Sequence, residues 1–459
     1  MEEPVVVMTH RTPDVLIIGG GLAGLAAGVQ LSRSGHSILL IEQKPRLGGR
    51  TYSFIHPETG DEVDNGQHLM MGCYHSTLKY LQMIGRSGLV EIQRNLFIVF
   101  RKEHSAAAHL RTSSLPATLY VLTGMLTFKA LTFSERLSLL RVGIQLILKD
   151  PDTDEHLRSI AVAQWLDELK QPEANKKVLW DVIAVGALND STEKISAALF
   201  VKVLKSAFFG SRLNSSMVIP KKGLSPVLID GAEEFIKKNN GEVILNSFIQ
   251  SIDRKNGKIE QVILETGEVI KPKAVISAVP YFDLPRLIPD TDGIGIHELN
   301  RFISSPIITI HLWFDAHFMH EQFAALLDSP FHWVFHKSVI YGKATTGLMY
   351  LALVVSGAHE LVEKEKDELS EMAHNELKRF YPAASAARVI HALIIKEKRA
   401  TFSPSVGLEQ IRPGTSTSIG NLFLAGDWTD TKLPATIEGA VQSGFDAAKN
   451  VNQFLHHER

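Results

Sequence analysis

The sequence predicts an α/β fold in which one nucleotide-binding sheet is assembled from separated segments of the chain. Near the N-terminus, an apolar strand, a glycine-rich turn and a helical stretch follow one another within residues 15–34. Near the C-terminus, a second apolar strand at 422–425 precedes a helical stretch that runs from about residue 435 onward. The region between these two segments has other helical and strand-like patterns, which predicts that further domains are inserted into the nucleotide-binding domain.

Length and composition bound the class of protein. A chain of 459 residues is too long to fold around a single compact core, so we expect two or three domains. Lys plus Arg total 48 against 50 Asp plus Glu, so we expect no nucleic-acid partner. The one cysteine, Cys73, excludes an internal disulfide and a cysteine-cluster metal site, and it favours the cytoplasm. We therefore expect no metal.

The glycine-rich turn follows the predicted strand 15–18 and carries Gly19, Gly21 and Gly24 in G-x-G-x-x-G spacing. These glycines permit a tight turn, close approach of a pyrophosphate to the helix N-terminus and close packing of helix on strand. Glu42 ends the next strand, where its carboxylate can accept hydrogen bonds from a ribose. The motif predicts a Rossmann-type βαβ unit but does not distinguish NAD from FAD.

Glu42 also opens the spacing E-x5-G-G-R, which ends in Gly48, Gly49 and Arg50. A guanidinium beside a glycine pair can reach the same pyrophosphate, and this indicates FAD. Taken alone, the run would indicate a glycine-rich surface turn with a solvated arginine.

The C-terminal run NLFLAGDWTDTKLPATIEGAVQSGFDAA predicts a buried strand, a turn at Gly426 and Asp427, and a helix opened by Pro434. The positive end of a helix and a short acid at this junction suit the ribityl chain and flavin ring of FAD. A plain terminal strand and helix would explain the apolar residues but not Gly426 and Asp427.

Four motifs together, GGGLAGLAAG, E-x5-GGR, AVISAVP (274–280) and AGDWTDTKLPATIEGAVQSG, resemble the FAD-dependent amine oxidase and phytoene desaturase superfamily over essentially the whole chain. The runs DNGQHLMMGCY, WDVIAVGALND and LPATIEGAV resemble more narrowly the hydroxysqualene dehydroxylases of the hopanoid pathway, also called squalene-associated FAD-dependent desaturases.

That resemblance implies a set of cofactor contacts. Ile249 matches a position whose backbone contacts adenine, and Gly66, Gln67 and His68 match the segment that passes the isoalloxazine ring. The residues matched to the ADP half of FAD are Gly19, Gly21, Gly24, Glu42, Gly49 and Arg50, and those matched to the flavin half are Gly426, Asp427 and Ile437. FAD is expected to bind without a covalent link, because the C-terminal motif contains no cysteine.

The resemblance also implies an activity, the reductive removal of the hydroxyl of hydroxysqualene to give squalene. This reaction needs a proton at the hydroxyl oxygen and a hydride from reduced flavin. His68 and Asp64 are the candidate proton donors; otherwise His68 hydrogen-bonds the backbone or the flavin, and Asp64 caps a turn. The alternatives are a phytoene-type desaturase that oxidises a polyene, an amine oxidase with Trp428 near the flavin, and a non-catalytic flavin-binding lipid carrier.

The same interpretation divides the chain into three domains. Residues 1–75, 220–280 and 415–459 are expected to bind FAD, residues 76–110 and 281–414 to form a mixed-sheet substrate domain, and residues 111–219 a helical subdomain. Within the last, residues 115–148 are unusually apolar and carry Leu137, Leu140, Ile144 and Ile147 on one face and Lys129, Arg136 and Arg141 between them. A buried helical pair and a patch in contact with a bilayer explain this pattern equally well.

The expected partners follow from the implied activity. They are a long-chain isoprenoid substrate, an external electron donor, the cytoplasmic membrane through a peripheral contact, and other enzymes of the squalene pathway. The sequence does not identify the donor, because FAD occupies the one convincing dinucleotide fingerprint.

Overall fold

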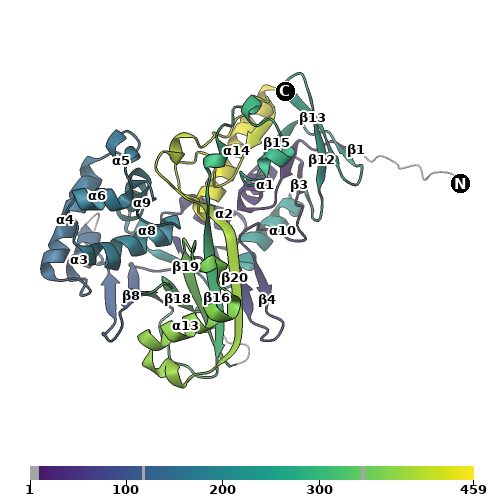
Figure 1. Cartoon of the computed structure of the whole chain (residues 1–459). Coiled ribbons are helices and arrows are strands. Elements are labelled where there is room, and N and C mark those ends of the chain that lie inside the picture. Colours follow the sequence, from purple (N-terminus) through teal and green to yellow (C-terminus); the bar gives the residue numbers. More distant parts are fainter. Residues whose placement is uncertain (1–9, 116–118, 343–346, 459) are drawn as a thin grey trace.

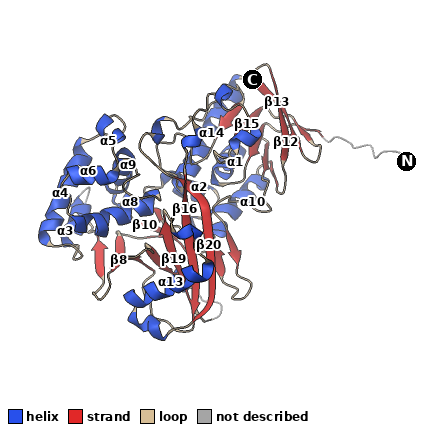
Figure 2. Cartoon of the chain, viewed as in Figure 1, coloured by secondary structure: helices blue, strands red, loops and turns tan. Residues whose placement is uncertain are grey.

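A computed structural model describes residues 10–115, 119–342 and 347–458. In Figure 1, a helical lobe lies at the left and a large sheet lies below, while β1 (His10–Arg11) and α14 (Ile437–His457), from opposite ends of the described chain, both lie in the upper part. Figure 2 shows the same division as a group of helices beside two separate groups of strands. The predicted α/β class with a mixed sheet is confirmed.

The nucleotide-binding sheet has five parallel strands in the order β11-β3-β2-β15-β21. Its central strands are continuous apolar runs that are buried throughout, as a parallel sheet covered on both faces requires. The strands come from the beginning, middle and end of the chain: β2 (Val15–Ile18), β3 (Ile38–Ile41), β11 (Gly241–Ile244), β15 (Ala274–Ser277) and β21 (Leu422–Leu424).

Helices cover one face of this sheet, and α1 packs directly on α14 (Figure 1). A Cβ on Gly444 would lie 2.2 Å from the carbonyl oxygen of Ala23, so glycine permits the close contact of these two helices. A four-stranded sheet in the order β1-β14-β13-β12, in which only the β1–β14 pair is parallel, covers the other face. The elements are α1 (Leu22–Arg33), α2 (His75–Met83), α10 (Asp230–Lys238), α14 (Ile437–His457), β1 (His10–Arg11), β12 (Ile249–Lys255), β13 (Lys258–Leu264) and β14 (Val269–Ile270).

A second, mixed sheet has seven strands in the order β20-β16-β19-β18-β17-β8-β9, and only the β17–β8 pair is parallel. The helix α13 (Lys366–Phe380) packs on one face. The predicted strand-like runs at 304–314, 331–336 and 347–356 contain β16, β18 and β19. The strands are β8 (Phe97–Arg101), β9 (Ala108–Arg111), β16 (Ser304–Phe314), β17 (Phe323–Leu326), β18 (Trp333–His336), β19 (Met349–Ser356) and β20 (Val389–Phe402).

The helical lobe packs on the other side of the mixed sheet, with which it shares the largest apolar cluster of the described chain. In α4, Thr132 and Glu135 form a capping box that fixes the helix start. None of the helices within the described ranges is long and apolar enough to cross a bilayer. The helices are α3 (Leu119–Thr127), α4 (Phe133–Leu148), α5 (Glu155–Ser159), α6 (Val162–Glu168), α7 (Glu173–Asn175), α8 (Asp181–Leu188) and α9 (Ala197–Phe208).

Small elements join the two sheets and position the polar turn at residues 64–68. A β4–β5 hairpin precedes the turn, and a three-stranded sheet in the order β6-β10-β7 follows it. The predicted division into three domains stays a prediction. The remaining strands and α-helices are β4 (Ser53–Ile55), β5 (Glu62–Asp64), β6 (Met70–Met71), β7 (Val90–Ile92), β10 (Met217–Pro220), α11 (Leu284–Leu287) and α12 (Lys337–Ile340).

Candidate functional site

The glycine-rich turn connects β2 to α1 as the sequence predicts. Gly19 has a φ of +106°, which favours glycine, and a Cβ there would lie 2.9 Å from the carbonyl oxygen of Ala278. A Cβ on Gly24 would lie 2.0 Å from the carbonyl oxygen of Gly19. These two glycines therefore serve the packing of the turn against α1 and against β15.

Gly21 has a different environment. A Cβ there would meet no heavy atom of the described protein within 4 Å, so open space lies over the start of α1. No side chain caps this helix, and its first turn carries no acidic residue. Unpaired N–H groups and the positive end of the helix dipole face that space, as binding of a pyrophosphate requires.

Glu42 and the GGR segment complete the turn. The buried Glu42 carboxylate accepts hydrogen bonds from the backbone N–H groups of Gly20 and Lys44, each at 2.8 Å. Each oxygen retains a lone pair for a ribose hydroxyl. Gly49 has a φ of +60° and packs on Gly21, where its added Cβ would lie 3.3 Å from the Cα.

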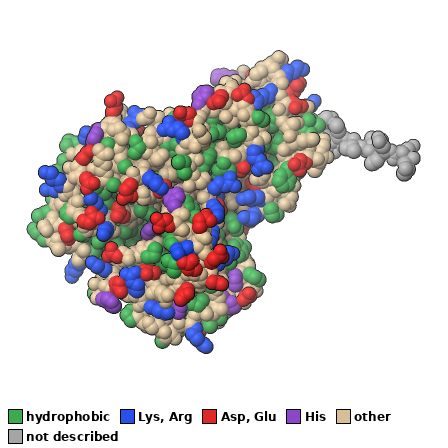
Figure 3. Space-filling model, viewed as in Figure 1, with side chains coloured by type: hydrophobic (Ala, Val, Ile, Leu, Met, Phe, Trp, Pro, Cys, Tyr) green, Lys and Arg blue, Asp and Glu red, His purple; other side chains and the backbone are tan. Residues whose placement is uncertain are grey.

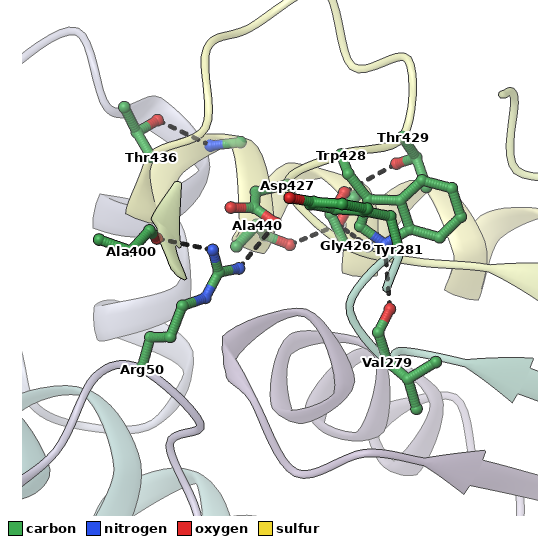
Figure 4. Close-up of polar contacts among 12 residues, drawn as sticks. Arg50, Val279, Tyr281, Ala400, Gly426, Asp427, Trp428, Thr429, Thr436 and Ala440 are labelled. Atoms are coloured by element: carbon green, nitrogen blue, oxygen red, sulfur yellow. Dashed lines mark hydrogen bonds and ion pairs between the residues drawn. The ribbon is translucent and has the colours of Figure 1, made fainter. Parts of the chain in front are cut away.

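Arg50 joins the two ends of the chain. Its guanidinium donates to Oδ1 of Asp427 at 2.8 Å and to the carbonyl oxygen of Ala400 at 2.7 Å (Figure 4). Arg50 and Asp427 are 377 positions apart in the sequence. The structure thus brings together two residues that were predicted independently, from opposite ends of the chain.

The C-terminal turn is equally fixed. Gly426 has a φ of +148°, and its N–H donates to the Ser443 hydroxyl at 2.8 Å. Trp428 is buried, and its indole N–H donates to the carbonyl oxygen of Val279 (Figure 4). Ile437 begins α14, and the Thr436 side chain caps that helix.

Ile249 begins β12, and backbone hydrogen bonds tie the segment before it to the end of β3. The N–H groups of Asn246 and Ser247 donate to the carbonyl oxygens of Lys44 and Glu42. The predicted adenine-contacting position therefore lies near the predicted ribose-binding acid in the fold.

The polar turn lies between the two sheets. Gly66 is buried, and a Cβ there would lie 3.6 Å from the Thr309 hydroxyl oxygen on β16 and from the His68 ring. The Nδ1 of His68 hydrogen-bonds the carbonyl oxygen of Gly66 at 2.8 Å. Burial lowers the pKa of His68 below its ordinary 6.5, which favours the neutral ring with Nε2 as an acceptor.

Asp64 belongs to a buried network that includes a lysine. The Asp64 and Lys337 side chains are 1% and 0% exposed, and the ammonium donates to Oδ2 at 2.8 Å. Tyr341 donates to the same oxygen, and the Leu224 N–H donates to Oδ1. Lys337 also donates to Oε1 of Gln67 and to the Tyr341 hydroxyl. Three acceptors therefore match the three N–H donors of the ammonium.

This network favours the ionised carboxylate. Burial opposes ionisation of Asp64, but the Lys337 charge and the hydrogen bonds outweigh it and hold its pKa below the ordinary 3.8. Burial also lowers the pKa of Lys337, against the opposing effect of Asp64. We therefore assign the pair as carboxylate and ammonium.

Several buried polar atoms around the site have no hydrogen-bond partner among the described residues. They include the Thr309 hydroxyl, Oδ1 of Asn65 and the hydroxyl of Ser277 at the end of β15. Buried polar groups are normally paired, so these atoms are available to hydrogen-bond a polar ligand. Together with the open space at Gly21, these unpaired atoms fit the predicted site for a dinucleotide.

The sequence did not point to Lys337 or Tyr341. Lys337 follows a predicted strand as one lysine among many, and only tertiary packing brings it to Asp64, 273 positions away. Arg412 was missed for the same reason: it is buried and donates to the carbonyl oxygens of Asp427 and Thr429, so it shapes the C-terminal turn.

The chain matches the family described as flavin containing amine oxidoreductase over residues 22–452. It is 26% identical over 439 residues to the hydroxysqualene dehydroxylase of Rhodopseudomonas palustris, an alignment that covers 95% of this chain and 97% of that protein. It is 25% identical over 458 residues to the 15-cis-phytoene desaturase of Glycine max, with 96% of this chain and 79% of that protein covered.

Solved structures share the fold. An oxidoreductase from Methanosarcina mazei has a TM-score of 0.73 at 17% identity, covering 95% of this chain and 99% of that one. A triple mutant of putrescine oxidase has a TM-score of 0.72 at 17% identity, covering 98% and 100%. The predicted superfamily, the FAD cofactor and the enzyme class are confirmed. This chain belongs to the flavin containing amine oxidoreductase family and is an FAD-dependent oxidoreductase.

Proposed function

We propose that this enzyme removes the hydroxyl of hydroxysqualene reductively to give squalene. The observation that carries the proposal is the junction of a polar turn and an apolar surface. Directly after His68, the half-buried Leu69, Met71 and Cys73 pack against the large apolar cluster between the mixed sheet and the helical lobe. A long isoprenoid with one hydroxyl needs such a junction, because its chain requires apolar contacts and its oxygen requires a polar group.

Similarity to known proteins leaves two candidate activities. The alignments cover 97% of the hydroxysqualene dehydroxylases of Rhodopseudomonas palustris and Zymomonas mobilis, but 79% of the Glycine max desaturase. Identities of 25–26% do not separate the two activities, so the desaturase remains the second candidate. The buried Trp428, which packs on Phe302 in the core, disfavours an amine oxidase.

The chain's own residues would act as follows. The turns at Gly19–Gly24, Gly49–Arg50 and Gly426–Asp427, with Glu42, Ile249 and Ile437, would hold FAD without a covalent link. FAD supplies hydride-transfer chemistry, and an external donor would supply the electrons. Burial raises the pKa of the Cys73 thiol to about 12, which disfavours its reaction as a thiolate.

His68 is the stronger of the two proton-donor candidates. Asp64 is held as a carboxylate, whereas the Nε2 of His68 can take up a proton and pass it to a hydroxyl. Because the pKa of His68 lies below its ordinary 6.5, the protonated fraction and the rate should rise as the pH falls below 7. We expect His68→Ala to slow flavin reoxidation by hydroxysqualene by about 10²–10⁴-fold in single turnover. Unchanged rates in His68→Ala and in Asp64→Asn would remove both residues from this role.

Anaerobic flavin absorbance tests the activity itself. With the flavin reduced and bleached, added hydroxysqualene should restore the yellow colour, and mass spectrometry should find squalene. Bleaching of the oxidised flavin by phytoene, with no response to hydroxysqualene, would establish the desaturase instead. A flavin that responds to neither would leave a non-catalytic lipid carrier.

We also propose that α4 rests on the surface of a bilayer, from which a C30 isoprenoid would enter. One face of α4 buries Leu139, Val142 and Leu146. The other exposes large apolar side chains, from 39% for Leu140 to 72% for Leu148. Figure 3 shows apolar surface beside Lys and Arg side chains at the left edge, where α3 and α4 lie. The exposed residues of this stripe are Phe133, Leu137, Leu140, Ile144, Ile147 and Leu148.

Basic residues flank the stripe, and this combination fits a membrane with anionic lipids. Lys129 and Arg141 are exposed beside it. Wild-type protein should sediment with phosphatidylglycerol vesicles, and the double variant Leu140→Glu/Ile144→Glu should remain in the supernatant. Ile55→Glu changes a more exposed apolar residue on β4, 63% against 53% for Ile144, and should bind vesicles like wild type. Equal sedimentation of all three proteins would contradict membrane contact through α4.

A further inference from the structure

We propose that the buried ion pair of Lys337 and Asp64 is a positioning device that fixes the Gln67 side chain as a hydrogen-bond donor toward the flavin-binding side of the polar turn. The inference deepens the proposed function and rests on it for the placement of the flavin beside residues 66–68. It assigns a role to Lys337, which no feature of the sequence identified.

The first step is that stability does not explain the pair. Removing an ammonium and a carboxylate from water costs several kcal/mol per ion, and well-packed apolar residues often replace such pairs without loss of stability. Asp64 and Lys337 are nevertheless both fully buried. The pair also links separate parts of the fold, since Asp64 ends β5 while Lys337 follows β18 of the mixed sheet.

The second step concerns orientation. A primary amide can present either its oxygen or its nitrogen to a neighbour, and the hydrogen-bond network decides which. Lys337 has only donors, so Oε1 of Gln67 must face it. Nε2 must then point to the other side of the amide, where it donates to the carbonyl oxygen of His68 at 3.4 Å. Asp64 and Tyr341 occupy the other two donors of Lys337, so its ammonium cannot turn away.

The third step concerns strength. A cation that donates to the oxygen of an amide polarises it, and its N–H groups become better donors. Within the described chain, Nε2 makes only that one long hydrogen bond, and a donor remains for a ligand. The pair itself is neutral, so its effect on a ligand must act mainly through Gln67.

A donor beside a flavin stabilises the negative charge that the flavin gains on reduction. We therefore expect Lys337→Met and Gln67→Leu to lower the midpoint potential of the bound flavin and to shift its visible spectrum. Lys337→Met frees the Gln67 amide to turn, and Gln67→Leu removes that amide, so both changes act on the same donor. The double variant Lys337→Met/Gln67→Leu should therefore shift the potential no further than the larger single change. Additive shifts would overturn the proposal.

The variant Asp64→Asn/Lys337→Met separates positioning from folding. It removes both charges, so the pair stays neutral and no unpaired charge is buried. We expect its Tm to recover toward wild type while its flavin potential stays low. If the potential recovers together with the Tm, Lys337 has a structural role alone. Lys398→Met, which removes an exposed lysine paired with Glu363 on the mixed sheet, should change neither quantity.

These measurements use FAD-loaded protein and chemical reduction by dithionite. They need no isoprenoid, so a failure of the proposed hydroxysqualene activity would not affect them. Conversely, an active dehydroxylase whose flavin potential is unchanged in Lys337→Met and Gln67→Leu would overturn this inference alone.

Discussion

The Gly21→Ala variant is expected to fold with wild-type stability and to lose most of its FAD. Gly21 has a φ of −73° and a ψ of 178°, which alanine adopts readily, and the added Cβ meets no protein atom within 4 Å. The same methyl group projects into the space over α1 where the pyrophosphate would lie. We expect FAD affinity to fall at least about tenfold, measured by fluorescence titration of the apoprotein.

Two other glycines serve as controls for this result. Gly24→Ala places a Cβ 2.0 Å from the carbonyl oxygen of Gly19, so both Tm and FAD content should fall. Gly143→Ala lies in α4, meets nothing within 4 Å, and should leave FAD content unchanged. A Gly21→Ala protein with wild-type affinity for FAD would show that the cofactor does not bind over the start of α1.

Lys337→Met should destabilise the protein strongly, because it leaves the Asp64 carboxylate buried without its cation. Breaking a buried pair by removing one partner costs about 3–5 kcal/mol. We expect Tm, measured by calorimetry, to fall by several degrees, and to recover in part in Asp64→Asn/Lys337→Met. Tyr341→Phe removes one hydrogen bond to Asp64 but keeps the ion pair, so it should cost about 1–3 kcal/mol.

The loss in Lys337→Met should depend on pH. In the wild type, the pKa of Asp64 is below its unfolded value of 3.8, so this carboxylate contributes stability above pH 4 and loses it as the pH falls further. Without Lys337, burial would raise the pKa of Asp64, and the variant would lose stability as the pH rises. The difference in Tm should therefore be largest near neutral pH and shrink toward pH 3. A constant difference across this range would contradict the assigned charges.

Local patterns in the sequence predict the nucleotide-binding sheet well. The strand 15–18 is confirmed, and the predicted strand 422–425 is observed as Leu422–Leu424. The glycine turn and both helices that begin after the turns are also confirmed, because a continuous apolar run followed by a glycine is typical of a buried strand and its turn. The mixed sheet was also predictable from its long apolar runs. The order of its strands was not, because β8 and β9 join the sheet although both end more than 190 positions before β16 begins at Ser304.

Residues of the candidate site that lie in local sequence motifs were predictable, and the others were not. Gly19, Gly21 and Gly24 follow the G-x-G-x-x-G spacing, which by itself indicates a dinucleotide-binding turn. Arg50 and Asp427 lie in motifs at opposite ends of the chain. The hydrogen bond between Arg50 and Asp427 depends on the tertiary fold, and neither motif predicts it. Lys337 lies in no recognisable motif. Its burial against Asp64 depends on how the start of α12 packs against the end of β5.

The FAD content of the purified protein tests the central claim most directly, namely that the two ends of this chain fold together around one flavin. Denaturation should release one FAD per chain, quantified by its absorbance against the protein concentration. A colourless protein that releases no FAD, even after reconstitution with excess cofactor, would contradict this account.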